Sequence, residues 1–342
     1  MIYIVLVLFI FCVFFSIVKI ERESDKKIVV WLFLLLLICV AGFRGFGVDR
    51  DYEQYVNAFY SSDATSIEIS FVMIVFFIKK LFGENFIYLF LSFATLGVFF
   101  KYRGIKELSS SIFLSLMVYI SHYYLLHEMT QIRAGVAAGF FLLCIKPIYD
   151  RNLKRFLLFA FLAVFFHYSA VLIFPLWYIN ARKSSSSYLY ALVLLGILLN
   201  MLQINLIMEL PIPYIQRKME VYKEAQELGL FGLDKINVWN LFFIMKLGLF
   251  FLLLYKKEFL IQKNKYLHLL LKIEALSLFA LPAFAFIPAL AFRVYELYGI
   301  VEIIILPLLV YLFDKRIIGY LMAIFVAFLF LAINLFYNHL IY

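Results

Sequence analysis

The sequence predicts an all-α protein that crosses a membrane many times, organised as a single integral membrane domain over residues 1–342. Apolar residues make up 66% of the chain and charged residues only 15%, whereas roughly 45–50% apolar residues is typical of soluble domains. Apolar runs long enough to cross a bilayer recur along the whole chain. A soluble globule cannot hide this much apolar surface, because its exterior must face water. Soluble enzymes, nucleic-acid-binding proteins and disordered chains are therefore excluded.

The predicted spans follow from the apolar runs, taken in chain order. A helix that crosses the bilayer needs about 17–25 mainly apolar residues. Candidate spans cover residues 2–18, 28–42, 86–100, 111–126, 132–144, 156–179, 188–206, 238–255, 267–284, 295–313 and 317–335. The first run has no basic segment ahead of it and no small-residue cleavage site after it, so we expect a retained span rather than a signal peptide.

Basic residues mark the predicted cytoplasmic side. Most of the 31 Lys and Arg residues lie in short segments between apolar runs, at residues 19–27, 101–106, 146–155, 182–183, 256–265 and 315–316. An excess of Lys and Arg in short loops is typical of the cytoplasmic side of a membrane protein. The net charge of +9 is thus explained by topology and not by a nucleic-acid partner, and we expect the N-terminus outside.

Two segments do not fit simple spans. The run 156–179 has basic residues at both ends, which predicts a re-entrant hairpin with its tip near His167 and Tyr168. The stretch 68–82 contains two lysines and is better interpreted as an interfacial segment. We therefore expect about 10–12 transmembrane helices, with extracytoplasmic loops at 43–66 and 211–237.

The first group of polar candidates follows the second predicted span. Arg44, Asp49, Arg50 and Asp51 stand there beside three glycines, which let a backbone turn sharply or approach a ligand closely. A solvated loop held by an internal Arg–Asp pair is the alternative. The two aspartates also match a short pattern by which some sugar-nucleotide enzymes hold a divalent metal, but three residues of that kind occur often by chance, and we expect neither a metal nor a cofactor.

The second group opens the span at 132–144. Gln131 and Arg133 precede Gly135 and Gly139, whose spacing indicates close packing of two helices. Arg133 lies outside the predicted cytoplasmic loops, and an arginine offers a fixed fork of donors that suits phosphate oxygens. Pairing of Arg133 with Glu128 or another buried acid is the structural alternative.

Two further candidates complete the outer face. His167 at the predicted hairpin tip can accept or donate a proton near neutral pH, or serve as a hydrogen-bonded structural group. Arg293 opens a later span and shares a helix face with Glu296, with which it can simply pair. Three separate parts of the chain thus bring Arg44, Arg133 and Arg293 to one membrane face, which suits a lipid-borne anion such as a pyrophosphate-linked lipid.

In their order along the chain these residues resemble a known family. The shared pieces are Phe43-Arg44, Gly47-x-Asp49, Asp51-Tyr52-x-x-Tyr55, Glu68 followed by Leu81-Phe82-Gly83, Gln131-Ile132-Arg133, Phe166-His167-x-Ser169-Ala170 with Pro175-Leu176, and Arg293 with Tyr295 and Tyr298. The chain resembles the EpsG-type polysaccharide polymerases, which belong with the Wzy-type O-antigen and capsule polymerases. The extra charge of Arg50 departs from the family pattern and leaves open which of the two aspartates meets the substrate.

The resemblance implies a GT-C-like glycosyltransferase of the bacterial inner membrane that works on the periplasmic face. Such enzymes join oligosaccharide repeat units carried on undecaprenyl pyrophosphate into O-antigen or capsular polysaccharide. The lipid-linked oligosaccharide, the bilayer and a chain-length regulator are the expected partners.

Site roles follow from joining the resemblance to the chemistry of the residues. Fixed cations lower the barrier where a leaving pyrophosphate gains charge, a role we expect of Arg133 and Arg293, with Arg44 third. His167 or Asp51 is the expected proton acceptor. Side chains expected to bind or orient the substrate are Asp49, Tyr52, Gln131 and Tyr295.

Other functions remain open from the sequence. An O-antigen ligase uses the same donor but usually carries a larger periplasmic loop. A lipid-linked oligosaccharide flippase is a transporter that also needs cations, although two related halves and a charged central cavity are then expected. A membrane O-acetyltransferase is a weaker alternative, because the sequence shows no acyl-transfer constellation.

Overall fold

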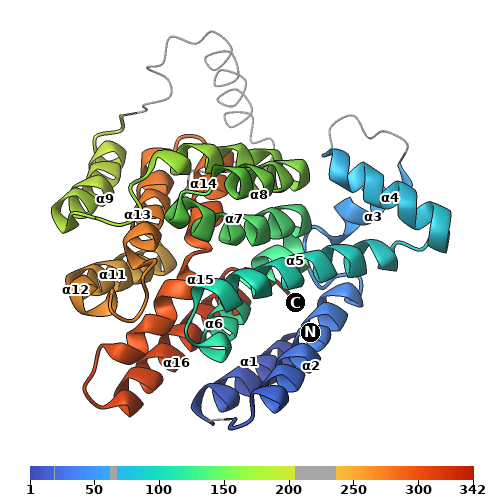
Figure 1. The fold of residues 1–342 in the computed structure, drawn as a ribbon. Coiled ribbons are helices and arrows are strands. Elements are labelled where there is room, and N and C mark those ends of the chain that lie inside the picture. The colour runs from blue at the N-terminus through green and yellow to red at the C-terminus, as the bar shows by residue number, and fades with distance from the viewer. Residues whose placement is uncertain (19, 62–67, 205–235) are drawn as a thin grey trace. The chain divides into compact units, whose positions relative to one another are not determined.

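The regular elements that the structure describes are helices. The computed structural model describes residues 1–18, 20–61, 68–204 and 236–342, and every regular element in those ranges is helical (Figure 1). The described chain divides into two compact units, which are described separately below. The first comprises Met1–Ile179, Gln262–Tyr266 and Glu302–Tyr342, and the second comprises Asn180–Ile261 and Leu267–Val301.

The first unit begins with two apolar helices and two shorter ones. These are α1 (Ile2–Ile17), α2 (Glu23–Gly42), α3 (Tyr52–Tyr60) and α4 (Ile69–Phe82). The rings of Phe11 and Phe33 stack 4.6 Å apart between α1 and α2, which lie side by side in Figure 1. Arg22 precedes α2 in extended conformation, and Glu23 and Asp25 lie in its first turn, where negative charge complements the helix dipole. The region predicted as an extracytoplasmic loop at 43–66 thus contains α3, while 62–66 lie outside the described residues.

The core of the first unit is built on α5 (Ile87–Leu108) and α7 (Ile132–Asp150), with α6 (Ile112–Val118) and the π-helical segment η1 (Tyr119–Thr130) between them. Every residue of η1 is buried. The expectation of a short basic loop at 101–106 is wrong, because α5 runs through it and Lys101 is fully buried. A lysine in the sequence indicates a loop where its charge must reach water. The charge of Lys101 is instead paired with a carboxylate inside the protein.

Two glycines of α7 allow neighbouring backbones to come close. A Cβ atom on Gly139 would lie 2.9 Å from Phe100 Cβ and 3.3 Å from Lys101 N, both in α5. A Cβ on Gly135 would lie 3.0 Å from His127 Cβ, in η1. The prediction that this glycine spacing serves close helix packing is confirmed.

A Gly139→Ala substitution is expected to destabilise the protein by about 1–3 kcal/mol, because the added methyl group overpacks the contact with α5. The matched control is Gly248→Ala, also in a helix, where nothing lies within 4 Å of the added Cβ. Thermal unfolding in detergent should show a lower midpoint for the first variant alone. Equal midpoints would mean that α5 moves aside without cost.

A break at His167 divides the run predicted as a hairpin. The run forms α8 (Leu153–Phe166) and the 3₁₀ helix η2 (Tyr168–Tyr178), and His167 between them is extended, with φ −154° and ψ 118°. Ring centroids lie 5.2 Å apart for Phe156 and Trp177, and 5.1 Å apart for Phe161 and Phe174. The two helices therefore run antiparallel and place His167 at their turn. Re-entry of this pair into a membrane stays a prediction.

The other described helices are divided between the two units. The first unit closes with α15 (Glu302–Ile305), η4 (Leu306–Tyr311), α16 (Arg316–Ala332) and η5 (Ile333–Tyr337). The second contains α9 (Ser186–Met201), α11 (Leu241–Tyr255), α12 (Lys257–Leu260), α13 (Leu267–Ala283) and α14 (Pro288–Gly299). In that unit Gly196 of α9 lies against the backbone of Phe279 in α13, where a Cβ would be 2.7 Å from the carbonyl oxygen. Of the second predicted loop, 211–235 lie outside the described residues.

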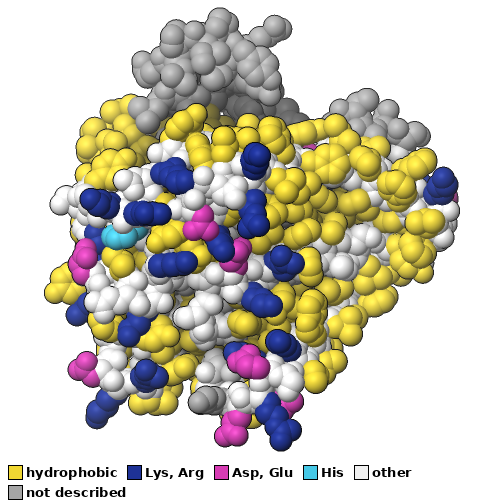
Figure 2. Space-filling view, in the orientation of Figure 1, with side chains coloured by type: hydrophobic (Ala, Val, Ile, Leu, Met, Phe, Trp, Pro, Cys, Tyr) yellow, Lys and Arg dark blue, Asp and Glu magenta, His cyan; other side chains and the backbone are white. Residues whose placement is uncertain are grey.

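Three helical runs in the described ranges are long and apolar enough to cross a membrane: Ile132–Asp150, Pro288–Tyr311 and Arg316–Tyr337. Shorter apolar helices occur at Ile2–Ile17, Tyr168–Tyr178, Ser186–Met201 and Leu241–Tyr255. Large apolar side chains are exposed on many of the helices, and Figure 2 shows hydrophobic side chains covering the surface over α4. Apolar exposure on this scale is unusual for a soluble monomer and fits a membrane protein. The total of about 10–12 spans and the side assigned to each loop stay predictions.

Candidate functional site

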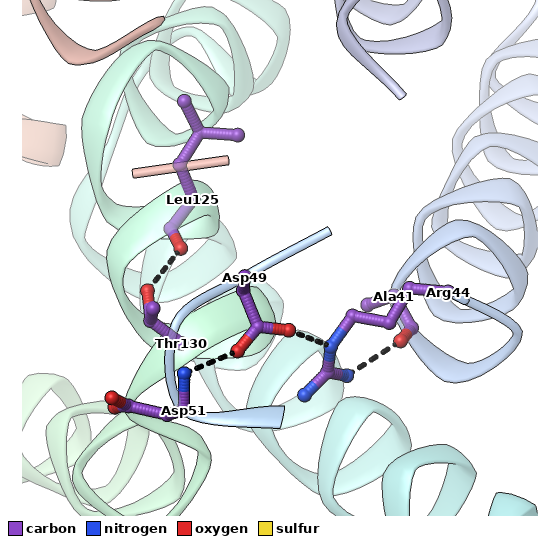
Figure 3. Close-up of polar contacts among 6 residues, drawn as sticks. All are labelled: Ala41, Arg44, Asp49, Asp51, Leu125 and Thr130. Carbon is purple, nitrogen blue, oxygen red and sulfur yellow. Dashed lines mark hydrogen bonds and ion pairs between the residues drawn. The ribbon is translucent and has the colours of Figure 1, made fainter. Parts of the chain in front are cut away.

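A buried ion pair organises the turn between α2 and α3. The Nε atom of Arg44 donates to Oδ2 of Asp49 at 2.7 Å, and Nη1 donates to the carbonyl oxygen of Ala41, also at 2.7 Å (Figure 3). The guanidinium carbon of Arg44 lies 3.9 Å from the centroid of the Phe90 ring in α5. The turn itself includes Gly47 at φ +76°, a left-handed conformation that favours glycine.

This geometry decides between the two interpretations of the pair. An internal Arg–Asp pair does form, but both side chains are buried rather than solvated. The Nη2 atom of Arg44 is buried and has no hydrogen-bond partner among the described residues. An unsatisfied buried donor is costly. An anion would be a suitable partner for this donor of Arg44.

The two aspartates of the cluster have different surroundings. Asp49 accepts from the backbone N–H of Asp51 at 3.0 Å as well as from Arg44. The carboxylate of Asp51 is turned away from this pair in Figure 3. Burial raises the pKa of Asp51 above its usual value, although the charge of Arg50 opposes the shift. Asp49 therefore stabilises the turn, whereas the carboxylate of Asp51 takes no part in the pair with Arg44.

A second cluster joins three elements through Glu68. One oxygen of this carboxylate, Oε2, accepts from Nη1 of Arg133. The other, Oε1, lies 2.8 Å from Nδ1 of His167. Glu68 immediately precedes α4, Arg133 is in the first turn of α7, and His167 is the break between α8 and η2. The acid is the more enclosed member, with 6% of its side chain exposed against 24% for Arg133 and 21% for His167.

Glu68 is ionised in this setting. Burial raises the pKa of its carboxyl group, but the hydrogen bond with His167 and the charge of Arg133 together outweigh burial, so the net pKa is lowered. The guanidinium of Arg133 also lies 5.8 Å from the centroid of the Tyr55 ring and 5.9 Å from that of Phe71. Arg133 is therefore held by the carboxylate and lies near two aromatic rings.

Aromatic side chains of α3 and α5 connect the two clusters. The ring of Tyr52 lies 5.1 Å from that of Phe90, on which Arg44 also packs. Tyr55 lies one turn further along α3. Its ring centroid is 6.5 Å from that of Phe90, and its ring also lies near the guanidinium of Arg133. Burial raises the pKa of Tyr55 to about 12, so its hydroxyl stays protonated and can act as a donor.

The first unit therefore contains most of the residues that were predicted from the sequence to form the site: Arg44, Asp49, Asp51, Tyr52, Gln131, Arg133 and His167. Gln131 stands at the junction of η1 and α7, two residues before Arg133. Among the described residues, no group of three or more His, Cys, Asp or Glu side chains is placed to hold a metal ion.

The remaining predicted site residues lie on α14 in the second unit. Arg293 is exposed, whereas Tyr295 is buried and its carbonyl oxygen accepts from Ser277 Oγ at 2.7 Å. The ring of Tyr295 also receives the ammonium group of Lys246, which lies 4.6 Å from its centroid. A part for Arg293 and Tyr295 in the site stays a prediction.

Sequence reasoning missed the central position of Glu68. It appeared only as one piece of the family resemblance, and its partners lie 65 and 99 residues away. The alternative that pairs Arg133 with Glu128 or another buried acid is confirmed in its general form, because Arg133 does pair with a buried acid. That acid is Glu68, whereas Glu128 pairs with Lys101. A carboxylate directly ahead of an amphipathic stretch was the available signal, since an interfacial helix can bring such a group to the membrane surface.

Comparison with known proteins adds an independent line of evidence. Residues 27–342 match the profile of the EpsG family. The chain is also 29% identical over 197 residues to the "Amylovoran biosynthesis protein AmsC" of Erwinia amylovora. That match spans 51% of this chain and 52% of the relative, so it covers about half of each. No solved structure matches the chain.

Proposed function

The chain belongs to the EpsG family, and from this premise we propose that it is a membrane glycosyltransferase that polymerises polysaccharide. The proposed substrates are oligosaccharide repeat units on undecaprenyl pyrophosphate, joined into O-antigen or capsular polysaccharide. The observation that carries the proposal is the Arg133–Glu68–His167 cluster, which holds a phosphate-binding cation beside a proton acceptor. The similarity to a protein of amylovoran biosynthesis supports the same class of activity.

The reaction needs two functions on opposite sides of one sugar carbon. The acceptor hydroxyl attacks the anomeric carbon of the growing chain, and the bond from that carbon to the pyrophosphate oxygen breaks. The hydroxyl proton passes to His167, with Asp51 as the alternative acceptor. The pyrophosphate gains negative charge in the transition state, which a fixed arginine fork stabilises. Arg133 and Arg293 take that role, with Arg44 third.

The remaining polar residues position the substrate. Asp49 holds Arg44 in the turn, while Tyr52, Gln131 and Tyr295 contact sugar hydroxyls. The arginines stabilise the charge of the leaving group, and no metal ion takes part.

We place the enzyme in the bacterial inner (cytoplasmic) membrane, with the site on the periplasmic or outer face. The bilayer and a chain-length regulator are its proposed partners. The apolar helices and the break at His167 support a GT-C-like arrangement of about 10–12 spans in which α8 and η2 form a re-entrant hairpin. In this arrangement the basic segments face the cytoplasm.

The proposal is tested by a gel of surface polysaccharide from a strain that lacks the gene, with and without a plasmid copy. In a Gram-negative host, a polymerase defect removes the long ladder of lipopolysaccharide and retains a band of core plus one repeat unit. The plasmid copy should restore the ladder. Loss of the single-unit band as well would contradict the proposal and indicate a ligase or a flippase, because attachment or delivery would then have failed.

A further inference from the structure

We infer that Glu68 is a positioning residue that holds both His167 and Arg133 in place for the reaction. Its carboxylate holds the imidazole of His167 with the proton on Nδ1, so that Nε2 carries the free lone pair that faces the acceptor. The inference rests on the proposed function, because it specifies how the proton acceptor of that reaction is prepared. It adds a residue to which neither the family match nor the similar protein assigns a role.

The contact with Glu68 favours one tautomer of the His167 imidazole. An ionised carboxylate only accepts hydrogen bonds, and a neutral imidazole has one N–H and one lone pair. The Oε1 atom of Glu68 lies 2.8 Å from Nδ1 of His167, and its lowered pKa keeps Glu68 ionised. The proton must therefore sit on Nδ1, which leaves Nε2 as the basic atom.

The second oxygen of Glu68 fixes the distance between base and cation. Its Oε2 atom accepts from Arg133 Nη1, so one buried carboxylate spans both functional groups. A glycosyl transfer needs the base on the acceptor side of the anomeric carbon and the cation on the leaving-group side. A group that holds the base and the cation at a fixed separation places them in the reactive arrangement before the substrate binds.

The same contact stabilises the charged intermediate form of the base. When Nε2 takes the hydroxyl proton, the ring becomes an imidazolium with two N–H donors, one of which still points at Glu68. The carboxylate then offsets the new positive charge beside Arg133. The other charged or titratable groups near this cluster are Tyr55, His127 and Asp51, whose pKa burial raises although the charge of Arg133 opposes the shift.

Nitrogen-15 NMR of the full-length protein in lipid nanodiscs reads the tautomer without any need for turnover. The chain has five histidines, so His167→Gln identifies the signal by its loss. We expect a protonated Nδ1 and an unprotonated Nε2 in the wild-type protein, and a mixture of tautomers in Glu68→Gln. The matched control is Glu53→Gln, which removes an exposed carboxylate of α3 and should leave the signal unchanged. A protonated Nε2 in the wild-type protein would overturn the inference.

A kinetic measurement separates positioning from a purely structural role. With lipid-linked repeat units extracted from the deletion strain as substrate, Glu68→Gln should lower kcat by about 100-fold, at the lower end of what a positioned base contributes. The KM should stay within about threefold, because Arg133 remains to bind pyrophosphate. A normal kcat in Glu68→Gln would also overturn the inference. Failure of the wild-type protein to make polymer would instead contradict the proposed function, while the tautomer could still be read.

Discussion

An Arg133→Ala variant is expected to make no long polymer while remaining in the membrane at the wild-type level. Removal of one fixed donor to a developing negative charge typically lowers kcat by about 100- to 1,000-fold. Arg133 is partly exposed, as is His167, and its guanidinium is held by Glu68 and lies near Tyr55 and Phe71. It is therefore both accessible to a substrate and fixed in direction, which are the two conditions for that effect.

The expected consequence of this change is loss of activity and not loss of folding. Glu68 keeps its contact with His167 when Arg133 is removed, so no buried carboxylate is left without a partner. An exposed arginine of α5, Arg103, provides the matched control, and Arg103→Ala should make a full ladder. Arg133→Lys retains the charge but not the planar fork and should recover only part of the activity.

The measurement combines the polysaccharide gel with an immunoblot of the membrane fraction. Full-length polymer from Arg133→Ala at a normal protein level would remove Arg133 from the proposed site. A short ladder, rather than none, would indicate that Arg44 or Arg293 supplies much of the stabilisation.

Local signals in the sequence predicted the position of several site residues. A histidine between two apolar stretches with basic ends predicted a turn, and the chain does break at His167. Small residues after Arg133 predicted close packing, which Gly139 provides. These predictions succeed because each depends on a few neighbouring residues and on general rules for helices in membranes.

Pairings between distant residues could not be predicted in the same way. Glu68 meets His167 across 99 residues and Arg133 across 65, and no periodicity marks such a contact. The sequence pattern predicts a loop at Lys101, because short clusters of Lys and Arg are typical of cytoplasmic loops. The acceptor of Lys101, Glu128, is 27 residues away in a π-helical segment, a helix type that sequence patterns do not indicate.

Lys101→Met is expected to destabilise the protein strongly and to lower its amount in the membrane. The ammonium group of Lys101 donates to Glu128 Oε1 and, at 2.6 Å, to the carbonyl oxygen of Gly135. The two charged side chains are 0% and 1% exposed. Removal of one partner leaves a buried charge uncompensated, which costs about 3–5 kcal/mol in measured cases. Thermal unfolding in detergent should therefore show a much lower midpoint than for the wild-type protein.

A double-mutant cycle tests whether the pair itself is responsible. Glu128→Gln alone should also destabilise, whereas Lys101→Met combined with Glu128→Gln should be more stable than the sum of the two single effects. The exposed pair of Lys26 and Glu23, with nitrogen and oxygen 3.5 Å apart, is the matched control. Lys26→Met should change stability little, because exposed ion pairs contribute about 1 kcal/mol or less. Additive effects in the cycle would show that the two groups do not depend on each other.

The double variant also connects stability to the site. Lys101 binds the carbonyl oxygen of Gly135 in the first turn of α7, two residues after Arg133. When both charges are removed, the uncompensated charge disappears but this anchor of the turn is lost as well. We therefore expect the double variant to recover its protein level while its polymer stays shorter than that of the wild type. Recovery of both would mean that packing around Gly139 alone is enough to hold Arg133 in place.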